Sequence, residues 1–102
     1  MLIYNIEISQ TASSGDWSFN TPKIHSSLLK QIIVKATTST TTFTLTITDE
    51  NNNIAYVNDT PATGTLREEV EIPVKGIYTI AVSSASADEA FSGVLVILER
   101  GD

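Results

Sequence analysis

Few side chains in this sequence could perform acid–base or nucleophilic chemistry. His25 is the only histidine, Ser26 and Ser27 follow it directly, and the chain has no cysteine. Neighbours on one segment do not form a nucleophile–base–orienter set, because those three groups must converge from different parts of a fold. The sequence also lacks the serine turn of a nucleophile elbow. We therefore predict that the protein is not an enzyme and that His25 has a structural or solvent-facing role.

A second group of side chains with chemical potential consists of acids in predicted loops. These acids are Asp49, Glu50, Asp59, Asp88 and Glu89. They would form an oxygen-rich cluster of the kind that binds calcium if their loops met at one end of the fold. However, the EF-hand spacing is absent, and the Asp- and Asn-rich segment 49–53 is typical of a tight turn. We predict no metal and no cofactor, with calcium binding as a minor alternative.

Aromatic residues suggest a different kind of site, because an exposed ring offers a large apolar face on which a sugar can stack. Trp17 is the best candidate, since the adjacent Asp16 adds a hydrogen-bond acceptor, and Tyr56 is the second. Tyr4 and Tyr78 alternate with polar residues on predicted strands and are expected to point into the core. Sugar stacking on Trp17 and Tyr56 is therefore an alternative hypothesis.

The most regular pattern is the alternation of threonine with large apolar residues over 42–48. Successive side chains of a strand point to opposite faces, so this segment predicts one buried face and one face lined by hydroxyl groups. The hydroxyl face consists of Thr42, Thr44, Thr46 and Thr48. Ice binding would need the same pattern on several flat strands, and only one strand has it. We interpret the threonine row as a solvent face or, second, as an interface with another protein.

The elements that would position these side chains are short strands. Alternating apolar residues predict strands near 2–8, 17–19, 28–36, 42–48, 54–57, 66–74, 78–82 and 91–98. Turn residues separate them, and no helical periodicity of useful length is present. The predicted fold is therefore all-β: an antiparallel β-sandwich or jelly roll of seven to eight short strands.

Two of these strands carry further expectations. In the strand over 28–36 we choose Ile32, Val34 and Ala36 as the inward face, which leaves Leu29 and Ile33 outward as a second candidate interface. The opposite register is also compatible with this apolar segment. The continuous apolar run 94–98 predicts a strand that is central or covered on both faces.

Composition narrows the class of partners. The chain has 102 residues, of which 41% are hydrophobic, and a formal net charge of −6. These values suit one domain over 1–102, and they argue against partners such as nucleic acid or an anionic membrane. The N-terminal residues do not resemble a signal peptide, and no stretch approaches the ~20 apolar residues of a membrane span. We expect synthesis in the cytoplasm.

One local motif resembles known jelly-roll domains. Residues 72–82 contain a proline, two residues, a glycine, one residue and a tyrosine, from Pro73 to Tyr78. This segment looks like the strand–turn–strand of bacterial pre-peptidase C-terminal domains and related carbohydrate-binding modules. The resemblance covers about a tenth of the chain and implies a fold, not an activity.

As a whole, the acidic, cysteine-free, Ser/Thr-rich chain is similar in type to small accessory proteins of tailed-bacteriophage virions. The resemblance implies a non-enzymatic virion structural protein, made in the host cytoplasm, whose partner is the major capsid protein or another virion protein. Within that class we predict a capsid decoration (auxiliary) protein that binds and stabilises the assembled phage head. The alternatives are a carbohydrate-binding β-sandwich module and a small tail or head-fibre component, and self-association stays open.

Overall fold

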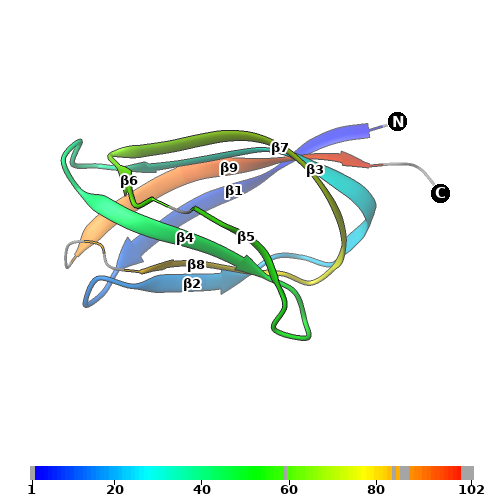
Figure 1. Ribbon diagram of the computed structural model, residues 1–102, viewed down its shortest axis with the longest axis horizontal. Coiled ribbons are helices and arrows are strands. Elements are labelled where there is room, and N and C mark those ends of the chain that lie inside the picture. Colours follow the sequence, from blue (N-terminus) through cyan, green and yellow to red (C-terminus); the bar gives the residue numbers. More distant parts are fainter. Residues whose placement is uncertain (1, 59, 84, 86–87, 100–102) are drawn as a thin grey trace.

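A computed structural model describes residues 2–58, 60–83, 85 and 88–99. These residues form nine strands and no helix (Figure 1), so this part of the chain offers no helix that could cross a membrane. The strands are β1 (Leu2–Ala12), β2 (Trp17–Asn20), β3 (Ile24–Ala36), β4 (Thr42–Thr48), β5 (Ile54–Val57), β6 (Ala62–Thr63), β7 (Thr65–Gly76), β8 (Thr79–Ser83) and β9 (Glu89–Glu99).

The strands pair antiparallel in two sheets. One sheet has the order β1-β9-β3-β7 and the other the order β2-β8-β4-β5, with the short β6 paired to the start of β4. The pairs β1–β9, β2–β8, β3–β7 and β4–β5 are those of one long antiparallel hairpin folded over on itself. This is the strand order of a jelly roll. The predicted all-β sandwich is confirmed, and the ninth strand arises because Ala62–Thr63 pairs within a segment expected to be a loop.

The core lies between the two sheets (Figure 1). Phe43, Leu45 and Ile47 of β4 are 0–2% exposed, as the threonine alternation predicts. An aromatic contact joins the sheets, because the ring of Phe91 on β9 lies 5.1 Å from that of Phe43 and 5.8 Å from that of Trp17. Burial of these apolar side chains is the main force that holds one sheet against the other.

Strand β3 contains a bulge that reverses one sequence-based expectation. Leu29 pairs with Ile97 and Gln31 with Val96, so Lys30 is an extra residue relative to β9. An extra residue shifts the two-residue period, and Leu29 therefore points inward with 2% of its surface exposed. The predicted outward orientation of Leu29 is wrong, which removes it from any surface interface. Ile33 points outward and is half-buried, as predicted.

Strand β9 is central, between β1 and β3, as its apolar run predicts. Leu95 and Ile97 point into the core, whereas Val94, Val96 and Leu98 point outward and are half-buried. Both the inner and the outer side of this strand are therefore apolar. The second sheet covers only the inner side.

Candidate functional site

The threonine row lies on the outer face of the β2-β8-β4-β5 sheet. Thr42 is exposed, and Thr44, Thr46 and Thr48 are half-buried because neighbouring strands flank them. The cross-strand partners on β8 are Ser83 for Thr44, Ala81 for Thr46 and Thr79 for Thr48. The hydroxyl row of one strand is thus extended by small side chains on the next.

This outer face, which we call the hydroxyl face, carries no charge. None of the strands β2, β8, β4, β5 and β6 contains Asp, Glu, Lys or Arg. On β2, Ser18 and Asn20 point outward, and the hydroxyl of Thr79 donates a hydrogen bond of 2.9 Å to Oδ1 of Asn20. On the β5 side, Ile54 and Val57 are 64% and 39% exposed. The face therefore combines hydroxyl groups with a small apolar rim.

Trp17 does not present its ring to solvent. Only 6% of its surface is exposed, and its ring stacks on Phe19 with a centroid distance of 6.0 Å and lies beside Phe91. Trp17 and Phe19 lie on the inner side of β2, with the exposed Ser18 between them. The ring of Trp17 is therefore in the core, and no exposed face remains on which a sugar could stack. Tyr78 is buried and Tyr4 half-buried against the core, as predicted.

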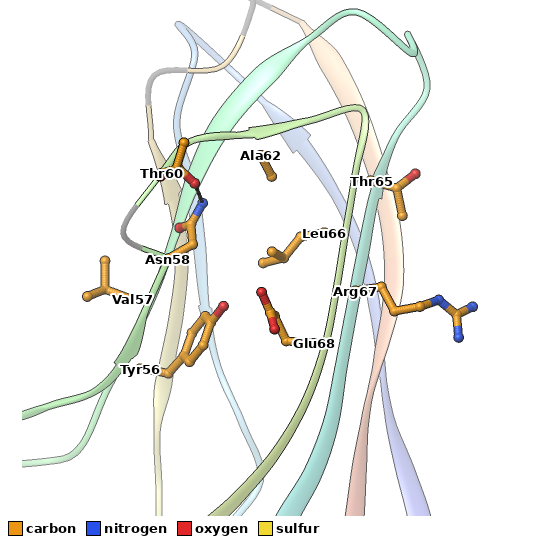
Figure 2. A pocket seen from close by; sticks show the side chains of 9 residues that line it. All are labelled: Tyr56, Val57, Asn58, Thr60, Ala62, Thr65, Leu66, Arg67 and Glu68. Carbon is orange, nitrogen blue, oxygen red and sulfur yellow. Dashed lines mark hydrogen bonds between the residues drawn. The ribbon is translucent and has the colours of Figure 1, made fainter.

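Tyr56 lines a cleft at the open side of the sandwich, where β5 and β7 are the edge strands (Figure 2). The cleft has a volume of about 520 Å³. Its walls are formed by Tyr56, Val57, Asn58, Thr60, Ala62, Thr65, Leu66, Arg67 and Glu68. Figure 2 shows the side chains of Tyr56 and Glu68 reaching toward each other from opposite walls, whereas Arg67 points away from the cleft.

Asn58 fixes one wall of this cleft. It is 9% exposed, and its Oδ1 accepts a hydrogen bond of 2.8 Å from the amide of Leu45. Its Nδ2 donates to the carbonyl oxygens of Thr60, at 2.9 Å, and Phe43, at 3.4 Å. These bonds tie the segment after β5 to β4, so the cleft has a rigid wall on that side. No feature of the sequence predicted this role, because it depends on strands that are distant in the chain.

The histidine and the serines beside it do not form a catalytic arrangement. His25 is exposed. Ser27 is buried, with 1% of its surface exposed, and its hydroxyl donates a hydrogen bond to the backbone carbonyl of His25. This hydroxyl therefore satisfies a local backbone group.

The loop acids occupy two ends of the fold. Oδ1 of Asp49, after the end of β4, accepts hydrogen bonds from the amides of Asn51 and Asn53, and these bonds lower the pKa of its carboxyl group. Oε2 of Glu89 accepts a bond of 2.6 Å from the amide of Thr38, before the start of β4, and this bond lowers its pKa. The loops that carry Asp49 and Glu89 therefore do not meet at one end, which was the condition for a calcium cluster that includes both acids. Asp59 lies outside the described residues, and the described residues include no group of three or more potential metal ligands.

Comparisons with known proteins add little. No protein-family model and no curated protein sequence matches this chain. Solved structures of infectious bursal disease virus are similar to it, one of the Gx strain with a TM-score of 0.48 and 15% identity and one of the Gt strain with 0.39 and 12%. Each match covers 99% of this chain and 32% of the other, so this chain spans about a third of their length. With TM-scores below 0.5, these likenesses carry no argument about function.

Proposed function

We propose that this chain is a non-enzymatic virion structural protein, a capsid decoration (auxiliary) protein that binds and stabilises an assembled phage head. The observation that carries the proposal is the hydroxyl face, whose strands contain no charged residue in a chain of net charge −6. Lys, Glu, Arg and Asp are among the residue types most often exposed to water, and these strands contain none of them. The composition of the face instead suits contact with another protein.

Physical chemistry explains why such a face suits a shell-binding protein. Hydroxyl groups can exchange water for hydrogen bonds to a partner, whereas a charged group would have to be paired or would oppose burial. The exposed Ile54 and Val57 add apolar contact at one side of the face. An interface of this kind is modest for one copy, but a protein that bridges neighbouring capsid subunits gains strength from simultaneous contacts.

The fold is compatible with this role by analogy alone. Jelly rolls occur in viral capsid domains and also in lectins and enzymes, so topology does not select among these functions. The proposal therefore depends on the composition of the hydroxyl face.

Purified virions test the proposal. Quantitative mass spectrometry of particles from the phage that encodes this chain should detect it at many copies relative to the major capsid protein. Absence from the particles, or a few copies only, contradicts decoration. Recovery of the protein with separated tails or fibres instead of heads would favour the tail or head-fibre alternative.

A matched pair of variants then locates the contact. Thr46→Lys places a charge at the centre of the hydroxyl face, and Asn51→Lys places the same charge in the exposed turn after β4. We expect Thr46→Lys to weaken binding to shells that lack the protein by at least about tenfold, because a charge is buried without a partner. Asn51→Lys should bind like the unmodified protein. Equal binding by both variants would exclude the hydroxyl face as the contact.

The cleft beside Tyr56 favours a second candidate, sugar binding. The ring of Tyr56 and the carboxylate of Glu68 face the same space of about 520 Å³ (Figure 2), and an aromatic face with a nearby acceptor suits a sugar ring. A glycan-array screen with a Tyr56→Phe and a Glu68→Gln variant tests this candidate. A carbohydrate signal that Glu68→Gln abolishes supports it, and no signal from the unmodified protein excludes it.

A further inference from the structure

The outer face of the β1-β9-β3-β7 sheet carries an apolar stripe along its two central strands. Val94, Val96 and Leu98 of β9 and Leu28 and Ile33 of β3 all point outward. On β3 the stripe is interrupted by Gln31, which pairs with Val96. The described strands all belong to the two sheets, so no described strand forms a third layer over this stripe (Figure 1). We call this surface the striped face.

One row of the striped face is apolar from edge to edge. Ile3 pairs with Leu98, Leu98 with Leu28, and Leu28 with Pro73. Ile3 is 66% exposed, although it sits on a regular strand. A contiguous exposed apolar surface rimmed by polar residues is typical of a protein–protein contact.

The charged residues on the striped face balance one another. Three acids, Glu7, Glu69 and Glu71, and three bases, Lys35, Arg67 and Lys75, lie at outward positions beside the stripe. Glu71 also forms an ion pair of 2.7 Å with Lys30. The whole chain, in contrast, has a formal charge of −6. A second copy of this chain is repelled by most of the acidic surface, and a locally neutral face is where that repulsion is smallest.

The positions of two of these charges define a symmetry. Glu7, Val94, Ile33 and Arg67 form one row across the four strands, with the acid at the β1 edge and the arginine at the β7 edge. A two-fold axis parallel to the strands, lying between two facing copies, exchanges these edges. Each Glu7 then faces the Arg67 of the other copy, and Val94 faces Ile33. An axis across the strands would place Glu7 against Glu7.

Known packing geometry allows these contacts. Facing sheets cross at about 30°, and with the edges roughly 7 Å from the axis this rotation displaces Glu7 and Arg67 by only about 4 Å, within reach of their long side chains. Figure 2 shows that the side chain of Arg67 points away from the cleft, which is consistent with its place on the outer face. Four strands of about nine residues present roughly 600 Å², so a pair of faces buries about 1,200 Å², the lower end of stable interfaces.

We propose that the striped face binds the same face of a second copy and forms a two-fold dimer with the axis parallel to the strands. An interface at the lower end of the size range belongs with weak, reversible contacts, so we test for association at micromolar concentrations. This dimer is independent of the proposed virion role, because it uses the sheet opposite to the hydroxyl face. It also leaves both hydroxyl faces of the dimer outward, free for other contacts.

Sedimentation velocity at low ionic strength tests the dimer. Between about 1 and about 500 µM, the average mass should rise from the 11.0 kDa monomer toward twice that value. Val96→Lys, at the centre of the stripe, should weaken association by about 100-fold. Thr46→Lys, on the hydroxyl face, should leave it unchanged. A monomer at all concentrations overturns the proposal, and so does a Thr46→Lys variant that fails to associate.

A charge exchange tests the symmetry. Arg67→Glu should weaken the dimer by about tenfold, and adding Glu7→Arg should restore it to within about threefold, because the pairs are then re-formed with reversed signs. Both residues are exposed, so circular dichroism should show an unchanged fold. A double variant as weak as Arg67→Glu, or a single variant without effect, overturns the assignment of the axis.

Discussion

The two sheets are alike on their inner sides and opposite on their outer sides. Both inner sides are apolar and form one core. Outside, the hydroxyl face carries no charged residue, whereas β7 alone, in the other sheet, contains five charged residues. The striped face places its charges at the rim and its apolar side chains along the centre, and the hydroxyl face spreads small polar groups across its whole width.

This difference separates two physical demands. The inner side of a strand must be apolar because the core requires it, so its composition says little about function. The outer side is free of that demand, and its composition reflects what it contacts. We therefore expect the two outer faces to have different surroundings, and changes in one sheet to have little effect on the other.

The largest effect is expected where the sheets meet. Phe91→Ala removes the ring that contacts both Trp17 and Phe43, and it should lower the free energy of unfolding by about 3–5 kcal/mol. Chemical denaturation measures this value. Phe91→Leu, which keeps more of the volume, should cost less. Equal costs for the two variants would contradict this expectation and would mean that the ring contacts, and not the filled volume, supply the stabilisation.

A smaller loss of folding stability is expected from a change within the β1-β9-β3-β7 sheet. Gly93 of β9 lies so close to β3 that an added Cβ would overlap the carbonyl oxygen of Ile33. Gly93→Ala should therefore lower the free energy of unfolding by about 1–3 kcal/mol. Ser92→Ala, at the exposed neighbouring position, should change it by less than about 0.5 kcal/mol. A neutral Gly93→Ala would show that β9 and β3 can move apart at this point with little cost in stability.

The acid dependence of stability probes a link between the sheets. Glu89 belongs to β9, but its carboxylate accepts a hydrogen bond from the amide of Thr38, in the loop that leads to β4. This bond lowers the pKa of Glu89 in the folded state. Its stabilisation is therefore complete above the pKa of an unfolded glutamate and is lost as the pH falls through the lower folded-state pKa.

Denaturation curves at several acidic pH values measure this link. Glu89→Gln cannot ionise, so its stability should fall less steeply with decreasing pH than that of the unmodified protein. Other acids, including Asp49, contribute to the pH dependence of both proteins and cancel in the difference. Identical pH profiles would show that the ionised form of Glu89 adds nothing to stability.

The smallest effects on stability, and the sharpest contrast between the faces, should come from exchanging their chemistry. Thr46→Val and Val96→Thr are nearly equal in shape, and each should change the free energy of unfolding by less than about 1 kcal/mol. Only Val96→Thr should weaken self-association, by several-fold, in sedimentation experiments. If Thr46→Val weakened it equally, the two faces would not be distinct in function.

Several features were predictable from local pattern, and others depended on pairing. The alternation over 42–48 identified the buried and exposed sides of β4, because that strand is regular from end to end. The orientation of Leu29 was not predictable, because the bulge at Lys30 appears only when β3 is aligned with β9. In the same way, the two-residue β6 exists only through its pairing with β4.

For the candidate sites, too, the sequence identified single residues, and strand pairing decided which of them share a surface. The sequence located the threonine row but not the absence of charge across a whole sheet, which requires knowing that β2, β8, β4 and β5 are neighbours. It selected Trp17 for its chemistry, and the structure places that ring in the core because β2 pairs with β8 in a register that turns it inward. The cleft at Tyr56 joins β5 and β7, which lie on different sheets.

The sequence by itself determined the fold class, the alternation of inner and outer side chains on regular strands, and the lack of thiol chemistry. These properties are local, since they follow from side-chain type and the two-residue period of a strand. Only the tertiary structure decided which strands are neighbours, and therefore which outward side chains join into one surface. A face is a property of several strands at once, and the contacts that assemble it connect residues far apart in the chain.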